Sequence, residues 1–316
     1  MKIDDSPLTS QKSVAILMGT YNGGKYIAEQ LDSLLVQTHK NWRLIVSDDG
    51  SSDDTLGIIR NYQVAWGADK VQIRQGPRTG FAQNFLSMAC DPSIKADYYA
   101  FCDQDDVWLP EKLRVAVDYL DAVDNPAVPH VYCGRTAYVR DDLKPYRYSP
   151  EFVFPRTFRN ALVQSIAGGN TMVFDQPTKT LLEKTGSVPT PSHDWWLYQL
   201  VTGAAGVVYY DPKPYILYRQ HPDALIGGNT SLRARIERMS MVLRGRFKSF
   251  SDQNIECLRR CYPHITPAAR EKLELFNKMR AAGFKDRMRI FEVCGLYRQT
   301  RGGTLTLMLA ALLKKI

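Results

Sequence analysis

The sequence predicts an α/β fold, in which a mostly parallel, Rossmann-like central sheet is flanked by helices and followed by a basic, mainly helical C-terminal extension. Short apolar runs alternate with segments of helical spacing through the first part of the chain, which is typical of doubly wound parallel sheets. The charge then changes sign: the first 230 residues carry 22 Lys and Arg against 26 Asp and Glu, whereas residues 231–316 carry 19 against 7. We therefore place a main α/β domain at residues 1–230 and the extension at residues 231–316.

The composition is that of an ordinary globular protein, with 44% hydrophobic and 23% charged residues among 316. No apolar run approaches the roughly 20 residues that span a bilayer, so we do not expect an integral membrane protein. Met1–Ser13 is polar and lacks the apolar core of a signal peptide. We expect a cytoplasmic protein whose six cysteines are free thiols.

Three strand–helix units and a fourth strand are expected in the first part of the chain. Each strand is placed at an apolar run, and each helix where apolar residues recur at intervals of three and four. The expected strands are Val14–Met18, Trp42–Ser47, Val71–Arg74 and Tyr98–Cys102. The expected helices are Ile27–Leu35, Thr55–Tyr62 and Phe81–Cys90, the second begun by a capping Asp.

The pattern becomes mixed from Val131 onward. Further short strands are expected at Val131–Cys133, Thr171–Phe174, Gly206–Tyr210 and Tyr215–Arg219, separated by helices with ends near Pro189 and Pro191. Beyond Asn229 the sequence becomes Arg-rich and helical, as far as the amphipathic segment Leu305–Lys315. This change of composition places the boundary of the main domain near residue 230.

Asp103–Asp106 brings three carboxylates together directly after an apolar strand. Their mutual repulsion favours a bound cation, and Mg²⁺ or Mn²⁺ prefers oxygen ligands shared between carboxylates and phosphates. The alternative is a solvated turn in which Asp106 caps the helix that follows.

A second acidic cluster, Asp48–Thr55, follows the second strand, so both clusters would open onto the same edge of a parallel sheet. Asp48 is placed to accept hydrogen bonds from a base or ribose. Asp53 is interpreted as a helix cap, and a turn with a capping box would by itself account for the cluster.

His193–Trp196 begins an apolar helical stretch. Asp194 is suited to take a proton from an acceptor hydroxyl, and Trp195 to form the aromatic wall of a sugar site. The alternative is a helix cap followed by core tryptophans. His221 ends the last expected strand beside a Gly-rich loop, where it is either structural or a contact for a metal or phosphate.

In their order, these motifs resemble the inverting family 2 glycosyltransferases of GT-A fold, and within them the bacterial rhamnosyltransferase-like enzymes of surface polysaccharide assembly. The resemblance covers about residues 14–221. The stretches that carry it are ILMGTYNGGKYIAEQLDSLLVQTHKNWRLIVSDDGSSDDT, DYYAFCDQDDVWLPEKL, GGNTMVF, HDWWLYQL and YRQH. It implies that residues 1–230 are a GT-A catalytic domain.

The resemblance also implies roles for particular residues. The metal, Mg²⁺ or Mn²⁺, would be held by Asp103, Asp105 and His221, with Asp105 the nearer carboxylate. Asp194 would be the catalytic base, deprotonating the acceptor hydroxyl for a single inverting displacement. The nucleotide-sugar donor would be bound by Thr20, Tyr21, Asn22, Asp48, Arg78, Gly80, Asp103, Gln104, Gly169, Asn170 and Trp195, with Gly168 also near the donor sugar and acceptor.

Two positions depart from the pattern of similar sequences. His221 is followed by Pro222 where relatives often have Gly, and His193 precedes the expected base where many members of the family have Glu. The first departure concerns the loop that shapes acceptor choice. The second leaves Asp194 as the only carboxylate of its motif.

The expected partners are a dTDP- or UDP-sugar donor, a glycan or polyprenyl-linked acceptor, and no nucleic acid. The basic extension would contact anionic lipids at the inner face of the cytoplasmic membrane. Its helices could instead pack on the body and expose a solvated basic face. Two other functions are alternatives. A nucleotidyltransferase would need a signature loop that Gly19–Lys25 matches weakly, and a nucleic-acid-binding protein would leave the acidic motifs unexplained.

Overall fold

The computed structural model describes residues 11–220 and 246–316. Two of the sequence predictions therefore lie outside the described residues: the metal or phosphate contact of His221, and the domain boundary near residue 230.

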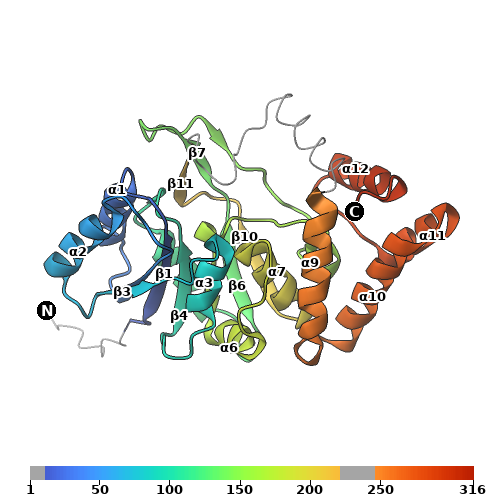
Figure 1. The fold of residues 1–316 in the computed structure, drawn as a ribbon, viewed down its shortest axis with the longest axis horizontal. Helices are drawn as coiled ribbons and strands as arrows, with labels where there is room; N and C mark the ends of the chain where they lie inside the picture. Colours follow the sequence, from blue (N-terminus) through green and yellow to red (C-terminus); the bar gives the residue numbers. More distant parts are fainter. Residues whose placement is uncertain (1–10, 221–245) are drawn as a thin grey trace, which may run out of the picture.

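A seven-stranded sheet forms the centre of the fold, with strand order β10-β6-β9-β4-β1-β2-β3 (Figure 1). All neighbouring pairs are parallel except those of β9, which runs antiparallel to both β4 and β6. The expected mostly parallel α/β fold is confirmed. The strands are β1 Val14–Thr20, β2 Trp42–Asp48, β3 Val71–Gln75, β4 Tyr98–Cys102, β6 His130–Gly134, β9 Val173–Asp175 and β10 Val207–Asp211.

Helices cover both faces of the sheet. Since successive side chains of a strand point to opposite faces, each strand contributes to two buried apolar clusters. In β1, Ala15 and Leu17 join one apolar cluster, with residues of α3, α6 and α7, while Ile16 and Met18 join the other, with residues of α1, α2 and α4. This explains why the strands read as continuous apolar runs. The helices are α1 Ile27–Leu35, α2 Thr55–Trp66, α3 Phe81–Ala89, α4 Lys112–Asp121, α5 Phe158–Ala161, α6 Gln176–Thr185 and α7 His193–Gly203.

A second, four-stranded sheet has the order β5-β11-β7-β8. Its strands are β5 Val107–Trp108, β7 Ala137–Val139, β8 Arg147–Tyr148 and β11 Ile216–Arg219. The strand expected at Tyr215–Arg219 is therefore present but belongs to this small sheet. The interpretation of Asp106 as a helix cap is wrong, because β5 follows it and α4 begins only at Lys112. Residues Gly169–Thr171, just before β9, form the short 3₁₀ turn η1.

The C-terminal helices pack onto the body rather than standing apart from it (Figure 1). Leu258 and Phe276 lie in the same apolar cluster as Trp196 and Leu200 of α7. These elements are α9 Arg246–Arg260, the 3₁₀ turn η2 Tyr262–His264, α10 Pro267–Ala281, α11 Phe284–Cys294 and α12 Arg301–Leu312. In the described part of the chain, no helix combines the length and apolar character needed to cross a membrane.

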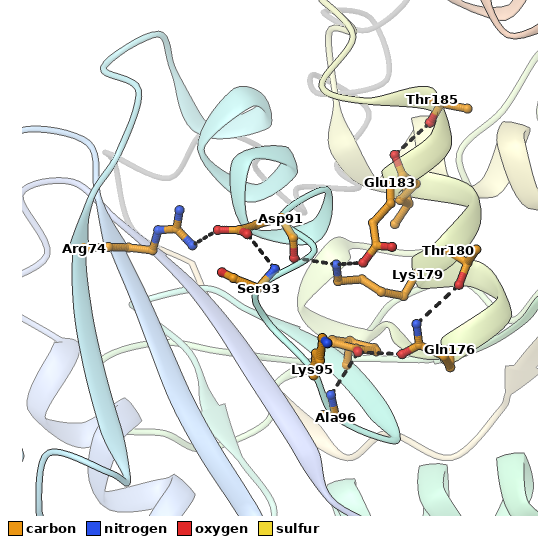
Figure 2. Close-up of polar contacts among 12 residues, drawn as sticks. Arg74, Asp91, Ser93, Lys95, Ala96, Gln176, Lys179, Thr180, Glu183 and Thr185 are labelled. Carbon is orange, nitrogen blue, oxygen red and sulfur yellow. Dashed lines mark hydrogen bonds and ion pairs between the residues drawn. The ribbon is translucent and has the colours of Figure 1, made fainter.

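A buried ion pair fastens α6 to the neighbouring elements (Figure 2). The Lys179 ammonium lies 2.5 Å from Glu183 and donates to the Asp91 carbonyl oxygen at 2.8 Å. Asp91 follows α3 and accepts a hydrogen bond from Arg74 of β3 at 2.7 Å. Lys179 and Asp91 lie toward the amino ends of the parallel strands, because α3 runs back along the sheet, whereas Arg74 lies near the carboxyl end of β3. The six cysteines are free.

Candidate active site

A cavity of about 1850 Å³ opens at the carboxyl ends of β1, β2, β3 and β4. This is the edge at which ligands bind in open α/β sheets. The loop before η1, the start of α7, and Tyr138 and Tyr218 of the second sheet also line it. Most of the residues expected at the site line this cavity: Thr20, Tyr21, Asn22, Asp48, Arg78, Gly80, Asp103, Gln104, Asp105, Gly168, Gly169, Asn170 and Asp194.

Trp195 does not line the cavity. Its side chain is buried, its indole nitrogen donates to the Ala161 carbonyl oxygen at 2.6 Å, and its ring lies 5.9 Å from that of Phe247 in α9. A residue next to Asp194 on a helix points about 100° away from it. The aromatic-wall interpretation of Trp195 is therefore corrected to a core position between α7, α5 and α9.

The loops after β1 and β2 are bound to one another. The backbone nitrogen of Asn22 donates to Ser51 Oγ at 2.9 Å, and its side-chain oxygen accepts from the Ser52 nitrogen at 2.8 Å. The Gly23 nitrogen donates to Thr55 Oγ1 at 2.8 Å. Asn22 has a φ of 48°, a left-handed conformation that asparagine tolerates better than most residues. The conformation of the first loop is thus fixed by the second.

Gln104 joins the acidic loop to the loop after β1. Its amide accepts from the Tyr21 backbone nitrogen and donates to the Tyr21 carbonyl oxygen, both at 2.9 Å. A Cβ at position 23 would lie 2.2 Å from Gln104 Oε1, so only glycine leaves room for the amide there. The role expected for Gln104 was donor binding, but in this geometry its polar atoms are taken up by the protein backbone.

The two aspartates at the end of β2 shape different loops. Asp48 accepts from Thr20 Oγ1 at 2.9 Å and from the Ser51 nitrogen at 2.9 Å. Asp49 accepts from the backbone nitrogens of Arg78, at 2.6 Å, and Gly80, at 2.9 Å. Sequence reasoning missed Asp49. The sequence signal was the pair of consecutive acids after a strand. Neighbouring side chains point in different directions, so the two acids contact different loops.

The carboxylates after β4 are crowded. Asp103 and Asp105 face the cavity. Burial, together with the charges of Asp105 and Asp194, raises the pKa of Asp103 to about 8. Lys112 lies beneath them, 1% exposed, and burial lowers its pKa to about 7. Asp103 and Asp105 form an acidic wall of the cavity, and a bound cation would favour the ionised form of Asp103.

Asp106 is fully buried, so it does not belong to a solvated turn. Its carboxylate accepts from the side-chain amide of Asn170 and from the Arg219 backbone nitrogen at 3.3 Å. Burial and the nearby acids raise its pKa. Asp106 thus ties the acidic loop to η1 and β11.

Arg219 is a second residue that sequence reasoning missed. It is 1% exposed, donates to the Asp105 carbonyl oxygen at 3.1 Å, and pairs with Glu29 of α1 at 2.6 Å. The sequence signal for Arg219 was its place in the YRQH stretch, two residues before the expected metal contact His221. Arg219 holds the backbone of Asp105 in place.

Asp194 is the second residue of α7, where the helix dipole favours a negative charge. One carboxylate oxygen accepts from the Trp195 nitrogen at 2.5 Å and from the Ser192 hydroxyl. Within residues 11–220 and 246–316 no donor bonds to the other oxygen, Oδ2. Asp194 lines the cavity together with Asp103 and Asp105, so its carboxylate and the acidic pair share one site.

His193 is buried behind Asp194, with its ring stacked on Phe85 at 4.1 Å. Burial lowers its pKa to about 4, so the imidazole is neutral at physiological pH. A Cβ at position 169 would lie 2.2 Å from His193 Nε2. Gly169 therefore lets the imidazole approach the turn beside the cavity.

The sequence profile of the family described as "Glycosyl transferase family 2" matches residues 15–183. This match covers more than half of the chain. The protein belongs to glycosyl transferase family 2. It is a glycosyltransferase, and the resemblance drawn from the motifs is confirmed. The alternative functions of nucleotidyltransferase and nucleic-acid-binding protein are set aside.

Relatives agree with this assignment, and solved structures share the fold. The glycosyltransferase is 29% identical to the dTDP-rhamnosyl transferase RfbG of Shigella flexneri over 71% of this chain and 78% of that relative. It is 26% identical to the putative teichuronic acid biosynthesis glycosyltransferase TuaG of Bacillus subtilis, over 57% and 66% of the two chains. S. aureus TarS 1–349 shares the fold. Its complex with UDP-GlcNAc aligns with a TM-score of 0.53 at 17% identity (86% of this chain, 82% of that chain), and its complex with UDP with 0.52 at 18% (89% and 75%).

Proposed function

We propose that this glycosyltransferase moves a sugar from a nucleotide diphospho-sugar to a hydroxyl of a glycan or lipid-linked acceptor, with inversion, in the synthesis of a cell-surface polysaccharide. The observation that carries the proposal is that Asp194 faces the same cavity as Asp103 and Asp105. A proton acceptor and a site for a charged leaving group are the two groups that a single displacement requires.

The donor is proposed to be a dTDP- or UDP-sugar, bound in the half of the cavity between β1, β2 and β3. Thr20, Asp48 and Arg78 line this half. TarS was solved with UDP and with UDP-GlcNAc, and RfbG is named a dTDP-rhamnosyl transferase. Rhamnose as the transferred sugar rests on the resemblance to RfbG.

A divalent metal, Mg²⁺ or Mn²⁺, fits the acidic wall. Asp103 and Asp105 supply oxygen ligands. Burial and then the charges of Asp105 and Asp194 raise the pKa of Asp103, and such an ion would favour its ionised form. In the described residues, no group of three or more His, Cys, Asp and Glu side chains is placed to hold a metal. The remaining ligands would then be diphosphate oxygens, water or His221. When bound, the metal supplies charge neutralisation for the departing diphosphate.

The residues of this chain divide the work between them. Asp194 Oδ2 accepts the proton of the acceptor hydroxyl as the hydroxyl oxygen bonds to the anomeric carbon. The bond from that carbon to the diphosphate breaks with its electron pair, and the nucleoside diphosphate leaves. Attack from the face opposite the leaving group inverts the anomeric configuration. Arg219 and Gln104 hold the acidic loop in position through the Asp105 and Tyr21 backbones.

A donor screen tests the proposal. Release of nucleoside diphosphate would be measured from dTDP- and UDP-sugars with Mg²⁺ or Mn²⁺, in the presence of acceptor. We expect release with at least one donor, and Asp194→Asn to abolish transfer while it leaves metal-dependent nucleotide binding intact. Transfer by Asp194→Asn would refute the base assignment. Release without metal would refute the role of the acidic wall.

We also propose that the basic extension contacts an anionic membrane, at the inner face of the cytoplasmic membrane, and so brings the site to a polyprenyl-linked acceptor. The excess of Lys and Arg in residues 231–316 supports this contact.

A further inference from the structure

Helix α12 is apolar on two opposite sides. Leu307, Ala310 and Ala311 are buried against the rest of the protein. Leu305, Leu309 and Leu313 are 55%, 50% and 60% exposed. Because these three leucines are spaced by four residues, they form a single stripe along the outer side of the helix. A surface helix normally has a polar outer side, so this stripe is suited to an apolar environment.

The stripe is held on a fixed helix. Thr300 caps the start of α12, accepting from the Gly303 nitrogen at 3.0 Å. At the other end, the buried Arg287 of α11 donates to the Ala311 and Leu312 carbonyl oxygens, both at 3.2 Å. These contacts satisfy the ends of the helix and present the leucines in one orientation.

The charges around the stripe identify its partner. Between Val293 and Ile316 the sequence holds four cations and no Asp or Glu. Two of the cations, Arg301 and Lys314, are exposed at the two ends of the leucine stripe. A second copy of this surface would place like charges face to face. Anionic headgroups above an apolar acyl region match both the cations and the leucines.

The position of α12 agrees with this assignment. In Figure 1, α12 lies toward the top of the molecule, as do β7 and β11. Tyr138 of β7 and Tyr218 of β11 line the cavity. Helix α12 and the second sheet, which borders the active site, therefore lie toward the same side of the molecule in this view.

We propose that Leu305, Leu309 and Leu313 insert into the interfacial region of an anionic bilayer, while Arg301 and Lys314 contact its headgroups. The inference deepens the proposed membrane contact by naming the surface and the lipid charge. It rests on the proposed function only in that the membrane would hold the polyprenyl-linked acceptor. Vesicle binding is measured without any sugar donor, so the failure of transfer and the failure of lipid binding are separate results.

The test is co-sedimentation of the full chain with vesicles of phosphatidylcholine alone or mixed with phosphatidylglycerol. We expect binding to the mixed vesicles, weakened by salt, and little binding to phosphatidylcholine alone. Replacing the three leucines by Gln (L305Q, L309Q, L313Q) should lower the vesicle partition coefficient by roughly tenfold or more. Gln keeps the helix propensity, and circular dichroism would verify the fold.

A matched control changes exposed apolar residues elsewhere. Leu35 and Val64, 53% and 86% exposed, belong to α1 and α2, at the opposite end of the molecule from the C-terminal helices. L35Q with V64Q should bind vesicles as the unchanged protein does. The proposal is overturned if the full chain binds neither vesicle, or if the triple variant binds as well as the control. A triple variant that loses only self-association would assign the stripe to a second copy.

Discussion

Gln104 lies between the two aspartates that face the cavity, yet its amide is bonded to the Tyr21 backbone. Replacing it by Leu removes two hydrogen bonds that together fix the spacing of the loops after β1 and β4. We expect a rise in donor KM and a fall in kcat of roughly tenfold, since each bond contributes about 1 kcal/mol. Steady-state kinetics would measure both. Gln72→Leu, exposed on β3 and outside the cavity, should leave both constants unchanged.

The raised pKa of Asp103 predicts a pH dependence of metal binding. In the fold Asp103 keeps its proton up to about pH 8, whereas the unfolded chain releases it near 3.8. Without a cation, folded-state stability is therefore lost as the pH rises from the lower value toward the upper one. A metal must displace this proton, so the rise in Tm caused by Mn²⁺ should grow with pH and level off above about 8.

Thermal unfolding with and without Mn²⁺, at about pH 6 and about pH 8, checks this prediction. Asp103→Asn should reduce the metal effect and remove its pH dependence. An equal metal-induced shift of Tm at both pH values in the unchanged protein would contradict it.

At the scale of elements, the Lys179 cluster of Figure 2 stabilises the packing of α6. Lys179→Met should lower the free energy of unfolding by about 2–3 kcal/mol, less than for a fully buried pair because Glu183 is partly exposed. Urea unfolding would measure the loss. The exposed neighbour Lys184→Met should cost less than about 0.5 kcal/mol. A change in KM at unchanged stability would mean that the cluster acts on the site.

The elements that could be predicted from the sequence are those with a long, regular pattern. The strands from Val14 to Cys102 were found because each apolar run is followed by a turn or an acid and then by helical spacing. The second sheet was not recognised, because strands as short as Val107–Trp108 carry no periodicity. The role of Asp106 was also missed, because its partners, Asn170 and Arg219, lie 64 and 113 positions away.

The site shows the same contrast between local sequence patterns and contacts of distant residues. The residues that line the cavity could be predicted because they follow strand ends within recognisable motifs. Which of them bond to protein rather than face the open cavity could not, since Gln104 and Asp48 are engaged by loops that only the fold brings close. Trp195 shows the same limit, because the direction of its side chain depends on the packing of α7 against α5 and α9.

For the whole molecule, the C-terminal helices complete the core. Leu258, Leu273 and Phe276 are buried in the cluster that contains Trp196. Removal of residues 246–316 would expose this face of α7 to water, which costs about 25 cal/mol for each Å² of apolar surface. We expect the shortened chain to be insoluble or to lose fixed tertiary packing. Near-ultraviolet circular dichroism would detect the loss, and a soluble fragment with a sharp unfolding transition would contradict the expectation.

The reversed direction of β9 decides where functional residues can be found along the chain. At the ends of the parallel strands, the side chains that face the cavity come after the strand, as Asp103 comes after β4. Strand β9 enters the sheet from the opposite side, so its contribution to the same rim comes before it, at Gly169 and Asn170. A change in the length of the segment that precedes β9 would therefore alter the cavity, whereas α6 begins directly after β9, at Gln176, and leads away from it.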